Sequence, residues 1–249
     1  MREPELSPLF RQWIEARVGP VESLEMMAGD ASRRVFCRVC TPSGSFVAMD
    51  SGRIPIESWL DINGLLSAHG FPVPGIVFSD APAGWAVMED LHDTRLLDLD
   101  RASYEGFLEE ALYIVERMQR ELTMHACAES IAGRRHFTAN FFAAELDHTL
   151  EHLFFRLLAV PAEEVAGLQA LFRELCAYVA EGPRVFCHRD YHSANLMVHG
   201  GRLVMVDWQD ARFGPIEYDL VSLLRDSYVD TGPEWETMAR RFVQAAGRS

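Results

Sequence analysis

The segment between residues 184 and 207 constrains the fold more than any other part of this chain. A short apolar run, Arg184 to Cys187, predicts a buried strand, and a polar loop follows it. Two further apolar runs flank Gly200-Gly201. They predict a tight hairpin, because consecutive glycines readily adopt the positive φ angles of such a turn. Polar residues therefore collect at the ends of three strands, where a functional site can form.

The polar loop has the spacing H-x-D-x-x-x-x-N, and an aspartate follows the hairpin. Its residues are His188-Arg189-Asp190-Tyr191-His192-Ser193-Ala194-Asn195, and the aspartate is Asp207. Phosphoryl transfer needs a carboxylate that orients the attacking hydroxyl and accepts its proton, and it needs oxygen ligands for Mg²⁺. We therefore predict Asp190 as the catalytic base and Asn195 and Asp207 as metal ligands. His188, His192 and Asp219 are predicted to support the loop.

Each of these residues alone has a plainer interpretation. An aspartate near a strand end is usually a cap or a turn residue, and a histidine is more often structural than catalytic. The joint pattern in a strand–loop–hairpin context is much rarer. It favours a small-molecule kinase that uses ATP and Mg²⁺.

The rest of the chain predicts an α+β fold with two lobes. Residues 1–92 contain strand-like runs separated by turns, with one helix at residues 56–69 and another near residues 6–14. From about Arg101 the apolar residues recur at helical spacing. We expect a small antiparallel β lobe that binds the nucleotide (1–92) and a larger, mainly helical catalytic lobe (93–249), with a cleft between them.

Charge and composition exclude several classes of partner. The formal charge of −14 argues against binding to a phosphate backbone. No apolar run approaches the ~20 residues that span a bilayer, and the N-terminus does not read as a secretory signal. The five scattered cysteines indicate reduced thiols. We expect a cytoplasmic protein with a small-molecule substrate and neither nucleic acid nor membrane as partner.

Several motifs resemble the aminoglycoside phosphotransferase and choline kinase family, which shares its bilobal fold with protein kinases. The motifs are Gly29-Asp30-Ala31-Ser32, Met88-Glu89-Asp90-Leu91, Asp207-Trp208-Gln209-Asp210 and Gly214-Pro215-Ile216-Glu217-Tyr218-Asp219, and the resemblance covers about residues 29–228. A protein kinase is excluded because only six residues separate Asp207 from Gly214, which leaves no room for an activation loop.

The same motifs, with Val47-Ala48-Met49-Asp50, are most similar to the bacterial anomeric kinases of N-acetylmuramate and N-acetylglucosamine. That resemblance implies phosphorylation of the anomeric hydroxyl of an amino sugar in cell-wall recycling. Such kinases continue further past the metal aspartate, so we expect a truncated or minimal helical lobe here. An aminoglycoside or choline-type kinase is the nearest alternative.

The nucleotide site is expected in the β lobe. Ser32 and the backbone around it are predicted to cover the phosphates, although an ordinary hairpin turn would have the same sequence. Backbone groups of the Met88–Leu91 segment, at Glu89 and Leu91, are predicted to contact adenine, although the segment is by itself only a strand end.

The chain contains no lysine, and all 23 of its basic residues are arginine. Asp50 occupies the position where the resemblance would place a phosphate-binding lysine. We predict that Arg34 or Arg38 replaces this lysine, with Arg38 held by Asp50 or Glu57. The alternative is that both arginines are solvent-facing strand residues.

Two further classes of function remain open at this point. A pseudokinase that binds nucleotide without turnover would also lack the lysine. The sequence His148-Thr149-Leu150-Glu151-His152 matches H-x-x-E-H, so a zinc metalloprotease with His148 and His152 as ligands and Glu151 as base is the other alternative. Two surface histidines on an amphipathic helix would produce the same pattern.

Overall fold

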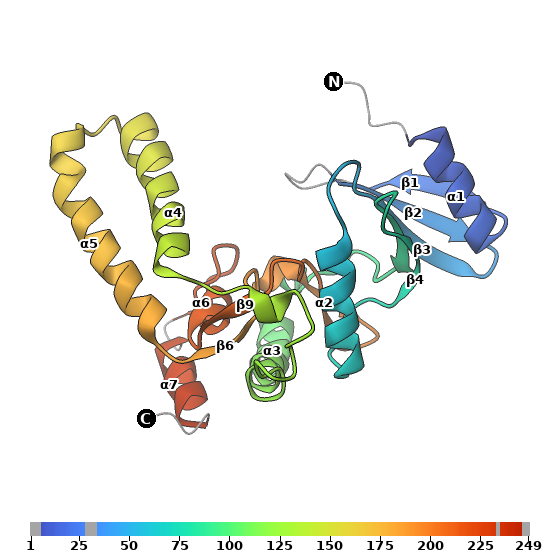
Figure 1. Cartoon of the computed structure of the whole chain (residues 1–249). Coiled ribbons are helices and arrows are strands. Elements are labelled where there is room, and N and C mark those ends of the chain that lie inside the picture. The colour runs from blue at the N-terminus through green and yellow to red at the C-terminus, as the bar shows by residue number, and fades with distance from the viewer. Residues whose placement is uncertain (1–5, 28–33, 233–234, 246–249) are drawn as a thin grey trace. The chain divides into compact units, whose positions relative to one another are not determined.

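The computed structural model describes residues 6–27, 34–232 and 235–245 of the chain (Figure 1). Its contacts divide the chain into two compact units. Unit 1 contains residues 1–110 and 193–209, and unit 2 contains residues 111–192 and 210–249. The chain therefore passes from unit 2 into unit 1 between His192 and Ser193, inside the loop that carries the predicted catalytic residues. The predicted lobe boundary at residue 92 stays a prediction.

A five-stranded antiparallel sheet forms the centre of unit 1, as the sequence predicts. The strand order is β1-β2-β3-β5-β4. The strands are β1 (Ser23–Met26), β2 (Val35–Thr41), β3 (Gly44–Asp50), β4 (Ile76–Asp80) and β5 (Trp85–Glu89). Because side chains alternate along a strand, the register of β2, β3 and β5 assigns every residue to one of two faces.

The helix α1 (Pro8–Val18) packs on one face of this sheet. Ser7 caps the helix, since its side chain accepts a hydrogen bond from the Phe10 amide at 3.1 Å, and Pro8 occupies the first turn, where proline is favoured. The buried cluster consists of Phe10, Trp13, Ile14, Cys37, Val39, Ala48 and Val87. This cluster anchors α1 by burial of apolar surface.

The hairpin that carries Asp207 belongs to unit 1. Its strands are β7 (Leu196–His199) and β8 (Arg202–Met205), and the glycines between them have φ angles of 58° and 77°. A turn with two positive φ angles is what the glycine pair predicts. Just after the hairpin, the indole nitrogen of Trp208 donates a hydrogen bond to the main-chain oxygen of Trp59 in α2 (Glu57–Ala68) at 2.9 Å. The end of the hairpin is thereby fixed to a helix of its own unit.

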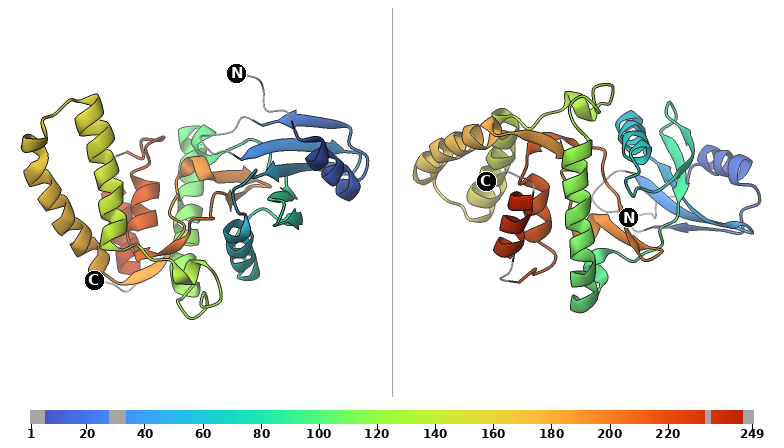
Figure 2. Two further views of the ribbon diagram at one scale, coloured as in Figure 1. Left: turned by 45° about the horizontal axis from the view of Figure 1, so that its top comes forward. Right: turned by 90° about the horizontal axis from the view of Figure 1, so that it is seen from below.

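Unit 2 is mainly helical. The helix α3 (Arg101–Glu121) enters it, followed by α4 (Ala139–Thr149), a π-helical stretch (Leu150–Leu157), α5 (Ala162–Glu181), α6 (Tyr218–Leu224) and α7 (Trp235–Ala245). The helices α4 and α5 form an antiparallel hairpin, which Figure 2 shows from two sides. The apolar pattern over residues 216–228 predicts a longer helix than α6, which ends at Leu224. No helix in the described ranges is long and apolar enough to cross a membrane.

A two-stranded sheet in unit 2 holds the loop that precedes Asp190. The predicted strand β6 (Arg184–Cys187) pairs antiparallel with β9 (Arg212–Pro215), which the sequence does not predict. Glycine and proline within four residues normally argue against a strand. Gly214 is nevertheless required, since a Cβ there would overlap the Phe137 ring. The α+β class expected from the sequence is confirmed.

Candidate active site

The loop around Asp190 is held in place by a buried carboxylate. Asp219 lies in α6 and is completely buried. Its two oxygens accept hydrogen bonds from the main-chain amides of His188 at 2.6 Å and of Arg189 at 3.0 Å. Both donors belong to the residues just before Asp190, so Asp219 makes the supporting contact that its predicted role requires. The role itself stays a proposal.

Burial raises the pKa of Asp219 to about 7, and repulsion from Asp190 adds to this, while the two amide hydrogen bonds act in the opposite direction. The folded chain therefore retains a proton on Asp219 at pH values where an ordinary aspartate has lost it. Each unit of pKa shift corresponds to about 1.4 kcal/mol of differential interaction.

We expect the stability advantage of the wild type over Asp219→Asn to fall as the pH rises from about 4 to 7. The folded-state pKa lies above the unfolded value of 3.8, so the contribution is fully present below that value and is lost as the pH rises through about 7. The expected change is on the order of 3 kcal/mol. Urea unfolding of both proteins at pH 4.5, 6 and 7.5 measures it, and parallel stability curves would contradict this titration.

One further contact and one unusual backbone angle characterise the loop. Tyr191 is completely buried, and its hydroxyl donates to the main-chain oxygen of Ala111 in α3 at 2.9 Å. Arg189 has a φ of 85°, a left-handed conformation that is unfavourable for a residue with a side chain. Strained backbone of this kind often occurs at functional sites, where surrounding contacts hold it in place.

Asp190 lines a pocket whose described walls all belong to unit 2. Its volume is ≈ 910 Å³, large enough for a small molecule. The lining residues with polar side chains are Tyr178, Glu181, Arg189, Asp190, Glu217, Tyr218 and Ser222. The sequence singles out Asp190 but misses the walls, because α5 and the start of α6 carry no motif for this role.

Asn195 and Asp207 lie at the base of the β7–β8 hairpin in unit 1. The Val206 amide donates to the main-chain oxygen of Asn195 at 3.0 Å, which places the two candidate ligands on adjoining ends of the hairpin. Asp207 has a φ of 66°, and its carboxylate accepts a hydrogen bond from Gln209 Nε2 at 2.5 Å. One carboxylate and one amide oxygen suit Mg²⁺, which prefers oxygen ligands and keeps several waters.

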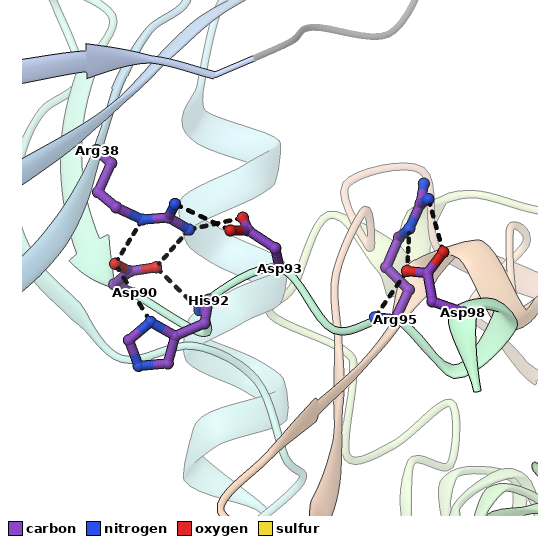
Figure 3. A network of polar contacts seen from close by, with 6 residues as sticks. All are labelled: Arg38, Asp90, His92, Asp93, Arg95 and Asp98. Atoms are coloured by element: carbon purple, nitrogen blue, oxygen red, sulfur yellow. Dashed lines mark hydrogen bonds and ion pairs between the residues drawn. The ribbon is translucent and has the colours of Figure 1, made fainter. Parts of the chain in front are cut away.

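The structure corrects the predicted partners of Arg38. Arg38 contacts neither Asp50 nor Glu57 through an ion pair; its guanidinium binds Asp90 at 2.8 Å and Asp93 at 2.7 Å (Figure 3). The register explains this, since Asp50 pairs with Val35 and so lies on the α1 face, whereas Arg38 points to the other face. Arg38 therefore clamps the segment after β5.

Arg38 makes charge-assisted, bidentate hydrogen bonds with each of the two carboxylates, Asp90 and Asp93. Hydrogen bonds from Arg38 Nε and Nη2 reach both oxygens of Asp90, and Nη1 and Nη2 reach both oxygens of Asp93. Burial acts to raise the pKa of Asp90, but hydrogen bonds from Arg38, Ser45 and the His92 amide outweigh it, so this pKa lies below its usual value. The Asp90 side chain is 1% exposed, so its charge depends on Arg38.

We expect Arg38→Ala to lower the free energy of unfolding by about 3 kcal/mol, because it leaves the Asp90 carboxylate buried without its cation. Arg95→Ala is the matched control, since Arg95 makes a bidentate pair with Asp98 that is exposed on both sides (Figure 3). The control should cost less than about 1 kcal/mol. Urea unfolding measures both, and equal losses would show that burial of Asp90 adds nothing.

The other predicted nucleotide contacts receive little geometric support. Ser32 lies outside the described residues, and Arg34 directly precedes β2. The Glu89 amide already donates to the main-chain oxygen of Gly75 at 2.8 Å, so it is engaged within the sheet. Leu91 is buried. The roles of these residues stay predictions.

The model of the phosphotransferase enzyme family matches residues 23–248, nearly the whole chain. The chain belongs to the phosphotransferase enzyme family. This confirms the resemblance inferred from the motifs.

Curated relatives of this phosphotransferase carry one name. The N-acetylmuramate/N-acetylglucosamine kinase of Neisseria meningitidis serogroup B is 31% identical over an alignment that covers 91% of this chain and 67% of the relative. The protein of the same name from Pseudomonas aeruginosa is 28% identical, with 84% and 62% covered. The chain thus spans about two thirds of the length of these relatives, and less than that for the Pseudomonas protein.

Solved structures show the fold of this phosphotransferase. An ADP-bound aminoglycoside phosphotransferase aligns with a TM-score of 0.68 at 15% identity, over 96% of this chain and 82% of that one. Choline kinase LicA from Streptococcus pneumoniae aligns with a TM-score of 0.67 at 18% identity, over 97% and 79%. The predicted kinase-like fold is therefore confirmed.

The zinc alternative gains no support in this phosphotransferase. The rings of His148 and His152 lie 4.1 Å apart, but Glu151 pairs with Arg156 at 2.8 Å. Within the described ranges, no group of three or more histidine, cysteine, aspartate or glutamate residues could hold a metal ion. The pattern H-x-x-E-H fits the plainer interpretation as surface histidines.

Proposed function

We propose that this phosphotransferase moves the terminal phosphoryl group of ATP to a hydroxyl group of a small sugar. The observation that carries the proposal is the position of Asp190. It lies on a loop held by the buried Asp219, and it lines a pocket that can hold a sugar. Acceptor hydroxyl and carboxylate would meet there, as general base catalysis requires.

In this mechanism Asp190 orients the attacking hydroxyl and takes its proton as the new bond to phosphorus forms and the bond from that phosphorus to the bridging oxygen of ATP breaks, which releases ADP. Asn195 and Asp207 would hold Mg²⁺, which neutralises the phosphate charge when bound. Asp219 positions the main chain before Asp190 without contact to the substrate. Positioning and electrostatics are the main contributions that a protein makes to phosphoryl transfer.

Nucleotide use is supported by solved structures of the same fold. These structures include a ternary complex of an aminoglycoside phosphotransferase with streptomycin and ATP, and LicA in complex with AMP. With no lysine in the chain, Arg34 is the remaining candidate for a direct phosphate contact, because the guanidinium of Arg38 is occupied by Asp90 and Asp93.

The proposed acceptor is an amino sugar, phosphorylated on its anomeric hydroxyl. This rests on the curated relatives, four of which are named N-acetylmuramate/N-acetylglucosamine kinase at 26–31% identity. Aminoglycoside and choline kinases are more distant, at 15–18% identity for the two solved structures described above.

An acceptor screen with ATP tests the proposal. N-acetylglucosamine, N-acetylmuramate, glucose, choline and kanamycin are each offered to the purified chain, and ADP release is measured. ADP release with the two N-acetylated amino sugars alone is expected. Turnover confined to choline or kanamycin would overturn the acceptor, and no turnover with any of the five would favour a pseudokinase.

A further inference from the structure

The pocket beside Asp190 carries an excess of negative charge. Among the described residues that line it, the acidic ones are Glu181, Asp190 and Glu217, and the basic one is Arg189. Three carboxylates therefore face one guanidinium. A pocket with this balance repels an anion that enters it, because charges interact more strongly beside a protein wall than in open water.

The charge of Arg189 is already compensated within unit 2. Its guanidinium lies 3.3 Å from Asp210 and 3.4 Å from Glu145, neither of which lines the pocket. It also lies over the ring of Phe141, 5.4 Å from the centroid. Arg189 would have to give up these contacts to bind a carboxylate of the substrate.

The carboxylates of Glu181 and Glu217 lie at opposite kinds of helix end, and α6 favours the charge of Glu217 while α5 does not favour that of Glu181. Glu217 occupies the position before α6 and makes no capping hydrogen bond with its side chain. Glu181 is the last residue of α5, where the negative end of the helix dipole adds to its charge. Both residues are exposed, so their charges act on whatever enters from solvent.

Aromatic side chains supply the rest of the recognition surface. Tyr178 and Tyr218 both line the pocket, and Tyr218 is held against Phe137 with ring centroids 4.2 Å apart. An aromatic face with nearby hydroxyl groups suits the apolar faces and hydroxyls of an uncharged sugar. None of these groups carries a positive charge.

We propose that this pocket selects an electrically neutral amino sugar over one that carries a carboxylate. The inference rests on the proposed function and narrows it. N-acetylmuramate differs from N-acetylglucosamine by a lactyl ether that ends in a carboxylate. That carboxylate would add a fourth negative charge to a pocket whose guanidinium is already paired, so N-acetylglucosamine is the better acceptor.

The test compares kcat/KM for the two sugars at low ionic strength and at 0.5 M NaCl. We expect N-acetylglucosamine to be favoured about tenfold at low salt, and the preference to shrink several-fold at high salt as the repulsion is screened. Equal efficiency, or a preference for N-acetylmuramate, would overturn the inference and leave the kinase assignment intact. No turnover with either sugar would instead overturn the proposed function, and the inference with it.

Two variants locate the effect in the pocket. Glu217→Gln and Glu181→Gln should each raise the efficiency with N-acetylmuramate relative to N-acetylglucosamine by about threefold to fivefold. Glu174→Gln, in α5 but outside the pocket, removes the same charge and should leave the ratio within twofold. A ratio that moves equally in all three variants would contradict a pocket effect. If a variant does not fold, the salt dependence of the kcat/KM ratio in the wild type still tests the inference.

Discussion

Asp190→Asn is expected to lower kcat by about a thousandfold or more, while the dissociation constant for Mg²⁺·ATP changes less than threefold. Asparagine keeps the size of the side chain but cannot take a proton from the acceptor hydroxyl. The loss should therefore appear in turnover and not in nucleotide binding. Single-turnover kinetics and calorimetry measure the two quantities separately.

The position of Asp190 allows this substitution to separate a loss of catalysis from a loss of structure. The loop is held by the Asp219 carboxylate through the amides of His188 and Arg189, and by the buried Tyr191 hydroxyl. None of these contacts uses the Asp190 side chain, so the fold should persist. Turnover within tenfold of the wild type would remove Asp190 from the proposed mechanism.

Asp207→Asn is expected to weaken Mg²⁺·ATP binding about tenfold or more and to lower kcat by about a hundredfold or more. Asparagine is chosen over alanine because Asp207 has a φ of 66°, a conformation that asparagine tolerates better than other residues with a side chain. The loss then reflects the charge on the metal ligand and not backbone strain.

The exposed Asp147 in α4 supplies the control for charge, as Asp147→Asn. This control should bind Mg²⁺·ATP as the wild type does. The difference between Asp207→Asn and the wild type should disappear when nucleotide binding is measured in EDTA. Unchanged affinity of Asp207→Asn in Mg²⁺ would show that Asp207 is not a ligand.

Local signals in the sequence were sufficient for much of the fold. The glycines at 200 and 201 predict the β7–β8 hairpin because they adopt positive φ angles, and the capping serine and proline predict the start of α1. Asp219 was predicted to support the loop from its place at the start of an apolar helix. Its carboxylate does lie against that loop, on the two amides before Asp190.

Features that depend on distant parts of the chain were missed. The strand β9 exists because it pairs with β6 beside Phe137, although its own residues include glycine and proline. The partner of Arg38 was wrong because a sequence without a known register does not reveal which face of the sheet a residue occupies. The pocket walls from α5 and α6 depend on helix packing, which no local motif encodes.

Phosphorus NMR of the reaction product tests the central claim most directly. ATP and N-acetylglucosamine are incubated with the chain in Mg²⁺, and the spectrum is recorded with and without proton decoupling. The account predicts a new monoester resonance that is coupled to the anomeric proton and disappears after mild acid treatment, as expected of a glycosyl phosphate. A monoester resonance coupled to the C6 protons would contradict it, and so would the absence of any new monoester resonance in the reaction with the wild-type protein.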